Sequence, residues 1–297
     1  MGNILAFDFG GTHVKSGLVN TQGHIFEKHL IKTPDSLENL LSYIKKRVMK
    51  YMDYDIIGIA ISAPGAVSDK GYISGASAIP YIHGPNIKKA IEQATSIRTE
   101  IENDANSAAL AEIWQGAAKG KRDVATVVIG TGIGGALIKE GTIHIGNTLH
   151  GGEFGYMILN PCNLGSHMNT FSELASTYSI IKRVATIKEL EPSLLTGEMI
   201  FDSAEKGDEI CKQAISEFFR MLAIGVYNIQ YMYDPELILI GGGISQRDDL
   251  IPQLRKEIND ILEIVEVATI VPKIERCTFQ SDANLIGSVY HFLQKNN

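Results

Sequence analysis

Asp8-Phe9-Gly10-Gly11-Thr12 lies between an apolar run at 4–7 and a β-branched run that begins at Val14. Because glycine has no Cβ, a turn with two glycines lets backbone N–H groups approach an anion closely. The Thr12 hydroxyl adds a donor, Asp8 can hold a cation through water, and Lys15 adds positive charge. The stretch predicts a phosphate-binding hairpin made of Asp8, Gly10, Gly11, Thr12 and Lys15. A glycine pair alone is also ordinary hairpin chemistry.

Two further glycine loops follow apolar strands and strengthen this interpretation. Gly130-Thr131-Gly132 comes after the run 124–129, and Gly241-Gly242-Gly243 comes after 237–240. Ligands of open α/β sheets bind at strand ends, so the third loop can border a nucleotide base or ribose. No Walker pattern is present, and the glycines of 130–135 precede a strand instead of a helix, which argues against a dinucleotide-binding fold.

The order of predicted elements occurs twice. The first half shows strands at 4–7, 14–19 and 24–30, then helix, strand, helix, strand and helix up to about 116. The second half repeats this order with strands at 124–129, 134–138 and 142–145, a less regular stretch to about 206, and later elements at 208–233, 237–240, 248–262, 269–271 and 282–293. We expect two similar lobes whose first glycine hairpins face each other across a cleft, where small molecules commonly bind. The alternative is that both hairpins are simple turns and the repeat is a coincidence of α/β architecture.

Composition excludes several classes of function. The 297 residues carry a net charge of −7 and a pI near 5.6, which disfavours a nucleic-acid surface. The most apolar stretch, 124–138, is shorter than the ~20 residues of a membrane-spanning helix and is broken by glycines. Cysteines at 162, 211 and 277 show no paired spacing, as is typical of a reducing compartment. We therefore expect a cytoplasmic protein without a membrane segment.

The candidate catalytic residue is Asp104, within Glu102-Asn103-Asp104-Ala105-Asn106 at a strand end. Phosphoryl transfer to an alcohol requires a base for the hydroxyl proton, a cradle for the γ-phosphate, and Mg²⁺ to offset charge. Asp104 could instead cap the helix that follows, which is the commonest use of aspartate there. Beside Asn103, whose amide suits a hydroxyl, and three glycine loops, catalysis is the favoured interpretation.

Six motifs in this order resemble the ROK family of sugar kinases over essentially the whole chain. They are Asp8 to Thr12, Ile61-Ser62-Ala63-Pro64-Gly65, Glu102 to Asn106, Gly130 to Gly135, Gly152-Glu153-Phe154-Gly155 and Gly241 to Gly243. The resemblance implies an α/β, actin-like ATPase (ribonuclease H-like) fold and the use of ATP with Mg²⁺. It also implies activation of a hexose 6-hydroxyl by Asp104. By the same resemblance Asn103, Gly65 and Glu153 serve the sugar, Asp8 to Thr12 and Thr131-Gly132 the phosphates, and Gly242-Gly243 the adenosine.

One departure from the family pattern concerns zinc and substrate. The usual Glu-x-Gly-His reads Glu153-Phe154-Gly155-Tyr156, and the family's cysteine cluster is reduced to Cys162, so we expect no structural zinc. Tyr156 is expected to alter the anomeric end of the sugar pocket and can stack on a second ring. Together with segments 168–169, 196–201 and 282–292, this stretch is similar to bacterial β-glucoside kinases, which phosphorylate cellobiose-type disaccharides. His150 and His167 could reach substrate but are expected to be ordinary histidines, and Glu173 is set aside because its spacing is off.

The sequence thus predicts an N-terminal lobe at 1–118, on which a C-terminal helix at about 282–297 packs back, and a nucleotide-binding lobe at 119–281. The expected substrate is a β-glucoside or hexose, and a homodimer is expected. Two alternatives stay open. One is a glucokinase or N-acetylhexosamine kinase with the same chemistry, and the other is a sugar-binding sensor without turnover. A repressor is disfavoured because the phosphate hairpin starts at residue 4, without the N-terminal winged helix of the family's repressors.

Overall fold

The computed structural model describes residues 2–160 and 169–296, and within them the chain forms two compact units. Unit 1 comprises Met1–Gly120, Ile145–Gly151 and Ser281–Asn297, and unit 2 comprises Lys121–His144 and Gly152–Gln280. Within the described ranges, no helix has the length and apolar character needed to cross a membrane. Whether the two units fold as separate domains stays a prediction.

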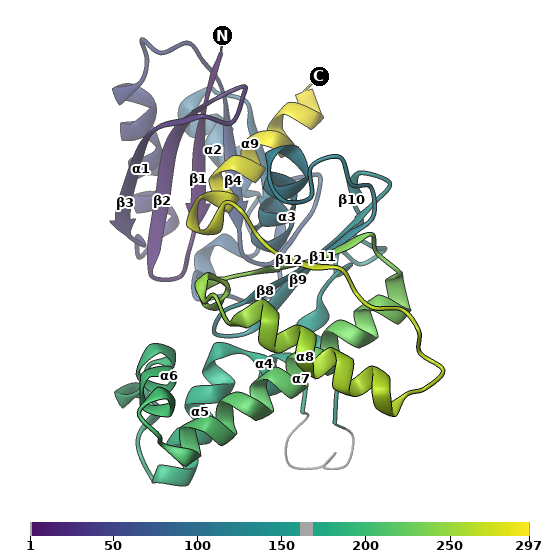
Figure 1. Cartoon of the computed structure of the whole chain (residues 1–297). Coiled ribbons are helices and arrows are strands. Elements are labelled where there is room, and N and C mark those ends of the chain that lie inside the picture. The colour runs from purple at the N-terminus through teal and green to yellow at the C-terminus, as the bar shows by residue number, and fades with distance from the viewer. Residues whose placement is uncertain (1, 161–168, 297) are drawn as a thin grey trace. The chain divides into compact units, whose positions relative to one another are not determined.

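Unit 1 is built on a five-stranded sheet in the order β3-β2-β1-β4-β7 (Figure 1). The strands are β1 (Asn3–Phe9), β2 (His13–Asn20), β3 (Ile25–Lys32), β4 (Ile56–Ala63) and β7 (Thr99–Asn103). The first three are antiparallel neighbours, whereas β4 runs parallel to both β1 and β7. A short hairpin of β5 (Ala66–Val67) and β6 (Ile73–Ser74) and a turn of 3-10 helix at Pro80–Ile82 occupy the long loop after β4.

Helices cover both faces of this sheet, so alternate side chains of β1 enter different cores. Leu5, Phe7 and Phe9 pack in the core that includes Ile44 of α1 (Leu37–Lys50) and Ile91 of α2 (Ile87–Thr95). Ile4 and Ala6 pack on the other face against α9 (Ala283–Asn296), through Leu285, Val289 and Phe292. The helix α9 also lies along α3 (Asp104–Gln115), where the Trp114 and Tyr290 rings stack at 5.0 Å. The two-sided burial explains why β1 and β4 are almost entirely apolar.

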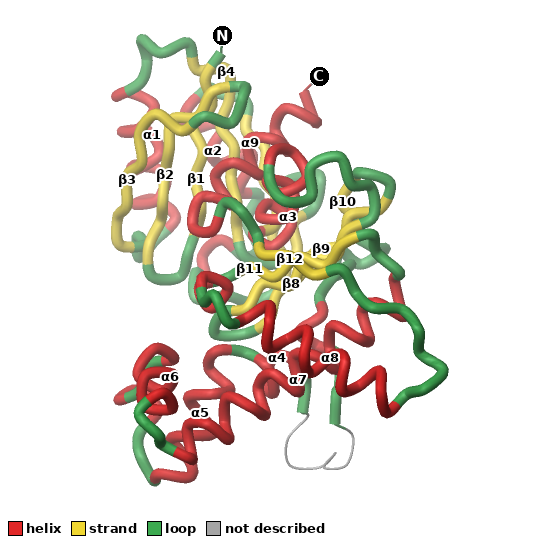
Figure 2. Tube along the Cα trace, viewed as in Figure 1, coloured by secondary structure: helices red, strands yellow, loops and turns green. Residues whose placement is uncertain are grey.

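Unit 2 repeats the same sheet order as β10-β9-β8-β11-β12 (Figure 2). The strands are β8 (Val124–Ile129), β9 (Ile133–Lys139), β10 (Thr142–Ile143), β11 (Leu237–Gly241) and β12 (Ile274–Arg276). The strands β8, β9 and β10 are antiparallel neighbours, and β11 is parallel to β8 and β12. The expected repetition of one sheet in both halves is therefore present.

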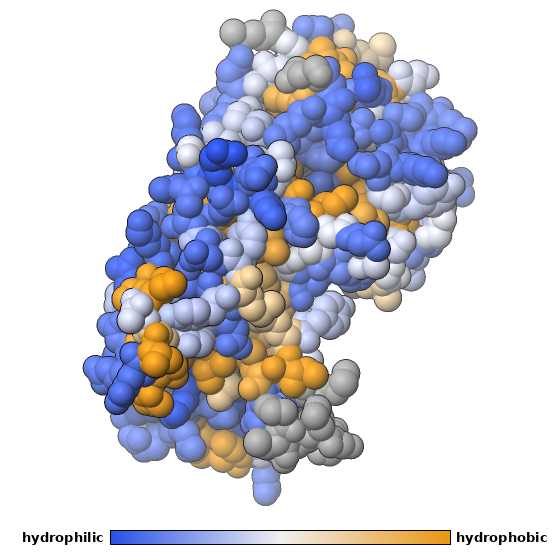
Figure 3. Space-filling view, turned by 90° about the vertical axis from the view of Figure 1, so that its right-hand side faces the viewer, coloured by the Kyte–Doolittle hydropathy of each residue, from blue (hydrophilic) through white to orange (hydrophobic). Residues whose placement is uncertain are grey.

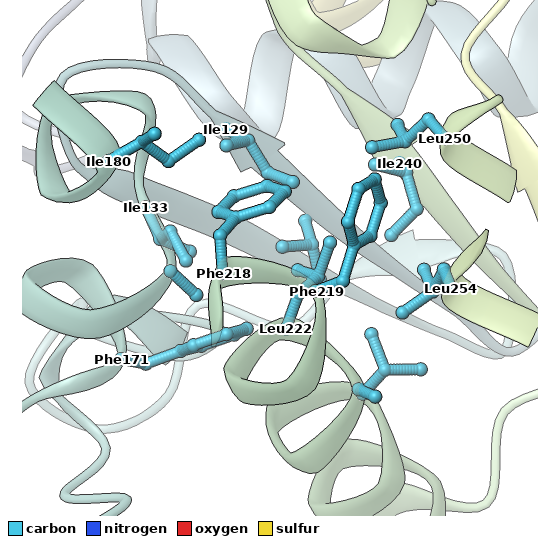
Figure 4. Close-up of a cluster of buried hydrophobic side chains, with 14 of the residues drawn as sticks. Ile129, Ile133, Phe171, Ile180, Phe218, Phe219, Leu222, Ile240, Leu250 and Leu254 are labelled. Carbon is cyan, nitrogen blue, oxygen red and sulfur yellow. The ribbon is translucent and has the colours of Figure 1, made fainter. Parts of the chain in front are cut away.

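The core of unit 2 centres on the long helix α7 (Glu209–Tyr233). Its Phe218, Phe219 and Leu222 point toward Ile129 of β8 and Ile240 of β11, and Phe171 closes one side (Figure 4). The other helices of unit 2 are α4 (Phe171–Ala175), α5 (Thr177–Lys188), α6 (Gly197–Glu205) and α8 (Leu250–Ile264). Short 3-10 turns lie at Phe154–Tyr156, Pro192–Leu194 and Gly243–Gln246, and a further one, Gln280–Asp282, lies where the chain passes from unit 2 to unit 1.

Two expectations about secondary structure were wrong. The strand expected at 269–271 is a loop, and the edge strand β12 lies at Ile274–Arg276. Ile270 and Val271 have strand propensity, but their side chains are exposed, whereas Ile274 is buried and pairs with Ile238. The stretch expected to be irregular before 206 contains α4, α5 and α6, which begin behind the capping side chains of Thr170, Ser176 and Thr196.

Candidate active site

The first glycine turn of unit 1 is held through its carbonyl groups. Gly10 N–H donates to His13 O at 3.0 Å and closes the hairpin between β1 and β2. Behind the turn, Thr33 donates its hydroxyl to Gly10 O at 2.6 Å and its N–H to Thr12 O at 3.0 Å. Gly11 and Thr12 are exposed on the turn. These bonds fix the turn through three of its carbonyl oxygens and engage the Gly10 N–H, so Gly11 and Thr12 are the exposed residues whose amides could approach an anion.

Asp8 lies at the end of β1, directly across the strand pair from Lys15. Its Oδ1 accepts a hydrogen bond from Asn284 Nδ2 of α9 at 2.9 Å. Burial raises the pKa of the Asp8 carboxyl, and the Asn284 amide, the charge of Lys15 and the Ser62 hydroxyl act against that rise. The Lys15 ammonium itself donates to Ser281 O just before α9. The predicted phosphate hairpin is thus tied to the last helix of the chain.

The Asn103-Asp104 pair stands where β7 becomes α3. Asn103 is the N-cap of α3, because its Oδ1 accepts the Asn106 N–H at 3.0 Å. Its Nδ2 donates to the carbonyl of Gly65, two residues after β4, at 3.0 Å. Asp104 is the first residue of the helix, and its Oδ1 accepts the Ala105 N–H at 2.8 Å. The cap that the alternative interpretation gave to Asp104 is therefore provided by Asn103.

The second glycine turn, in unit 2, is held by the starts of two helices. Ser172 Oγ of α4 accepts the Ile133 N–H at 2.8 Å, and Gly130 O accepts the Thr177 N–H at 2.9 Å. A Cβ on Gly132 would lie 3.4 Å from the Ser172 oxygen. Sequence reasoning missed Ser172. Its position two residues after the capping residue Thr170 is a local signal but does not indicate a contact with the turn.

The segment from Gly152 to Tyr156 packs flat on β9. Gly152 has φ +86°, and a Cβ there would lie 2.8 Å from Ala136 Cα. A Cβ on Gly155 would lie 2.1 Å from Ile133 O and 2.5 Å from Ser172 Oγ. Glu153 is partly buried before the 3-10 turn, and the Tyr156 side chain is 74% exposed. The two glycines therefore allow the backbone on either side of Glu153 to lie directly against β9, within unit 2.

A cleft of about 660 Å³ opens beside the second and third glycine loops. Gly130, Thr131 and Gly243 line it from the strand ends, and the helices contribute Thr177, Tyr178, Ile181, Gly197, Glu198 and Phe201, with Ile129, Ile244, Gln246 and Arg247 completing the wall. The size is within the usual range of small-molecule sites. Gly242 makes the loop possible, because it adopts φ +91° and a Cβ there would lie 2.0 Å from Ile129 O.

A guanidinium group forms part of one wall of this cleft, which sequence reasoning did not single out. The Arg247 guanidinium lies 3.9 Å from the centroid of the Phe201 ring and is held by two 3.0 Å hydrogen bonds to Asp249. Those carboxylate bonds raise the pKa of Arg247 further. A flat, fixed cation over an aromatic ring offers a stacking surface for a planar ligand.

The remaining sequence candidates have local roles or lie outside the described residues. His150 Nδ1 is 2.6 Å from Thr148 O. Glu173 forms a capping box with Thr170, accepting its N–H at 3.0 Å. Cys162, His167 and Met168 lie outside the described residues. The expected roles in catalysis and in binding of sugar and nucleotide stay predictions for all the site residues proposed from the sequence. These residues are Asp8, Gly10, Gly11, Thr12, Lys15, Gly65, Asn103, Asp104, Thr131, Gly132, Glu153, Tyr156, Gly242 and Gly243.

Comparison with known proteins identifies the family. A model described as the ROK family matches residues 4–295. A β-glucoside kinase of Listeria monocytogenes is 35% identical over 99% of this chain and 98% of its own length. Among solved structures, a ROK family protein from Streptococcus pneumoniae TIGR4 in complex with sucrose superposes with a TM-score of 0.92 at 39% identity, with 99% of each chain covered. A candidate N-acetylmannosamine kinase from Listeria monocytogenes superposes with a TM-score of 0.89 at 34% identity, over 99% of this chain and 100% of that one.

These findings confirm the expectations of fold and family. The two similar α/β units are those of the actin-like ATPase fold, and enzymes of this kind use ATP with a divalent metal ion. The chain belongs to the ROK family of sugar kinases.

Proposed function

We propose that this protein transfers the γ-phosphate of ATP to the 6-hydroxyl of the non-reducing glucosyl unit of a β-glucoside such as cellobiose. The observation that carries the proposal is the position of Asp104 at the start of α3, with the capping role taken by Asn103. A carboxylate that is not required as the cap can serve the substrate. Similarity to the Listeria monocytogenes β-glucoside kinase supports this substrate class.

In the proposed reaction Asp104 acts as general base. Its carboxylate accepts the proton of the sugar 6-hydroxyl while that oxygen forms a bond to the γ-phosphorus, and the bond from the γ-phosphorus to the bridging oxygen of ADP breaks. Asn103 would orient the sugar with the one amide N–H and the one lone pair that remain after its bonds to Gly65 and Asn106. Glu153 would accept hydrogen bonds from further sugar hydroxyls.

The phosphates would be bound by the two glycine turns, Gly10-Gly11-Thr12 with Lys15 and Thr131-Gly132. The cleft beside Gly242 and Gly243 would take the adenosine, with Arg247 against the base.

The residues present fit a magnesium ion that arrives with ATP. Such an ion keeps several waters and needs one or two carboxylates besides the phosphates. Asp8 would hold the magnesium ion through water. Its carboxylate lies next to the first glycine turn and accepts a hydrogen bond from Asn284. Mg²⁺ would offset the negative charge that develops on the phosphates.

We further propose that the protein lacks the family's structural zinc. Tyr156 stands where the family pattern has a histidine ligand, and Cys162 is all that remains of the family's cysteine cluster. Cys162 and His167 lie outside the described residues. Metal analysis of the purified protein should find no stoichiometric zinc, and one tightly held equivalent would contradict this assignment.

Tyr156 is proposed to hold the second sugar ring, because its side chain is largely exposed at the edge of the 152–156 segment. Tyr156→Ala should raise KM for cellobiose by roughly 2- to 12-fold, corresponding to an aromatic contact of ~0.5–1.5 kcal/mol, and leave KM for glucose nearly unchanged. Tyr156→Phe is the matched control and should behave as wild type. Equal effects of Tyr156→Ala on both sugars would assign this residue no role at an outer ring.

A second candidate function keeps the chemistry and changes the acceptor. The similarity to a candidate N-acetylmannosamine kinase favours a monosaccharide, whereas the sucrose complex of the Streptococcus pneumoniae protein favours a pocket for two rings without fixing the linkage. A sensor without turnover is the remaining alternative.

A homodimer and a cytoplasmic location are also part of the proposal. Met232, Ile264 and Val267 of unit 2 are strongly exposed. On the face drawn in Figure 3, apolar side chains gather in patches among hydrophilic ones. Patches of this kind often mark contact sites between proteins, which supports association without identifying the interface.

A further inference from the structure

The last helix of the chain, α9, contacts two acidic residues of unit 1, namely Asp8 in the predicted phosphate hairpin and Glu102, two residues before the candidate base Asp104. Asn284 and His291 lie seven residues apart, which places them two turns apart on one side of a helix. Asn284 Nδ2 donates to Asp8 Oδ1 at 2.9 Å. His291 Nδ1 lies 3.3 Å from Glu102 Oε2, and Glu102 is two residues before Asp104 in the sequence.

Glu102 transmits this contact to the candidate base. Its side chain is buried at the end of β7, and its Oε1 accepts the Asn103 N–H at 2.7 Å and the Asn106 Nδ2 at 3.1 Å. These two bonds span the turn from β7 into α3 in which Asp104 lies. Removing a partner of Glu102 would leave a buried carboxylate with fewer donors and would loosen this turn.

The His291 imidazole faces Glu102 in its neutral form. Burial lowers the pKa of His291 to about 4, with Lys295 and Lys88 acting in the same direction and Asp69 against it. The imidazole is therefore neutral near pH 7. An ionised Glu102 can only accept, so a hydrogen bond across this 3.3 Å contact would place the hydrogen on Nδ1 of His291. Burial raises the pKa of Glu102, with the Asn106 amide and the Asn103 N–H acting against that rise.

The close approach of α9 to α3 has its own cause in the sequence. A Cβ on Gly287 would lie 1.6 Å from Ser107 O and 3.0 Å from Ala111 N, so only glycine allows α9 to lie this near to α3. Gly287 stands between Asn284 and His291, one turn from each. The same surface of α9 therefore fits the backbone of α3 and reaches both acidic residues.

We propose that α9 is a positioning element of the active site, with Asn284 orienting Asp8 and His291, through Glu102, orienting the turn that carries Asp104. Neither residue touches a reacting atom. The inference rests on the proposed kinase function, and it assigns to the C-terminal helix a role besides covering the sheet with Leu285, Val289 and Phe292.

The test uses the full chain and steady-state kinetics with Mg-ATP and the best sugar acceptor. His291→Phe removes the donor and keeps a ring, and it should lower kcat roughly 10- to 100-fold, the range found when groups that orient a ligand are removed, with KM for ATP nearly unchanged. His291→Asn, whose Nδ2 can replace Nδ1 as donor, should restore most of kcat. Asn284→Ala should mainly raise KM for Mg-ATP, because Asp8 belongs to the phosphate side.

Ser288→Ala is the matched control on the same helix. Ser288 is buried, and its hydroxyl donates within the helix to Leu285 O at 3.0 Å, so this variant should keep both kcat and KM. Thermal melting of each variant separates loss of fold from loss of alignment. If the wild type is active and His291→Phe keeps the wild-type kcat, the role of α9 is overturned and the proposed function is not affected. The same conclusion follows if kcat falls in the variants only in proportion to their loss of melting temperature. An inactive wild type overturns the proposed function and this inference with it.

Discussion

Asp104→Asn is expected to bind sugar and ATP and to lose most turnover. The asparagine side chain has the same size, and its amide oxygen can accept the Ala105 N–H, which lies 2.8 Å from Asp104 Oδ1 in the wild type. The amide cannot take up the proton of the sugar hydroxyl. General-base catalysis typically contributes ~10²–10⁴-fold in rate, so kcat should fall by about that factor. Coupled measurement of ADP release gives kcat and KM, and calorimetry with sugar alone gives the binding constant.

Asp208→Asn is the matched control for this experiment. Asp208 also stands at a helix start, where it caps α7 through the Cys211 N–H at 3.0 Å, and asparagine can replace it as a cap. Its ion pair with Lys188 holds the pKa of Asp208 at about 2. Neither residue is among those that line the cleft of unit 2, so the replacement changes a helix-terminal charge outside the proposed site. The control should keep normal turnover. Near-normal turnover in Asp104→Asn as well would remove Asp104 from the chemistry.

Among the variants described, Phe171→Ala is expected to lower the free energy of unfolding most. The ring is fully buried beside α7 (Figure 4). Its Cζ lies 2.3 Å from where a Cβ on Gly225 of α7 would stand. Truncation of a buried phenylalanine typically costs ~3–5 kcal/mol, a large share of the ~5–15 kcal/mol by which proteins are stable. Urea unfolding followed by circular dichroism should show a lower midpoint with an unchanged slope.

Phe26→Ala controls for the loss of an aromatic ring as such. The Phe26 side chain is 57% exposed on β3, so its truncation should change the free energy of unfolding by less than about 0.5 kcal/mol. A change below about 1 kcal/mol in Phe171→Ala would show that the core of unit 2 is not packed around this ring. Phe171 directly precedes Ser172, which holds the second glycine turn, so a softened core should also weaken nucleotide binding.

The fold could be predicted from sequence because its signals are local and occur twice. The aliphatic runs at β1, β4, β8 and β11 and the glycine turns that follow β1 and β8 required only periodicity and turn chemistry. The strand expected at 269–271 was predicted wrongly, because the β-branched residues there have the propensity of a strand but not its burial. Which part of a β-branched segment pairs with β11 is decided by tertiary packing.

The candidate site was predictable where one residue carries the signal and was missed where several distant segments combine. Asp104 and the glycine loops are visible in a single stretch of sequence. Asn284, His291 and Ser172 are ordinary polar residues whose partners lie 276, 189 and 39 positions away, and no local pattern indicates such contacts. The stacking of Arg247 on Phe201 joins a loop to α6 in the same way.

The central claim is that the protein phosphorylates a β-glucoside, and ADP release with Mg-ATP against a panel of sugars tests it most directly. The panel consists of cellobiose, gentiobiose, sucrose, glucose, N-acetylglucosamine and N-acetylmannosamine, with Asp104→Asn as the inactive control. The proposal predicts the highest kcat/KM for cellobiose and gentiobiose, with the phosphate on the 6-hydroxyl of the non-reducing ring. Preference for a monosaccharide or for sucrose would contradict the β-glucoside assignment and keep the kinase, whereas no ADP release with any sugar would contradict the kinase itself.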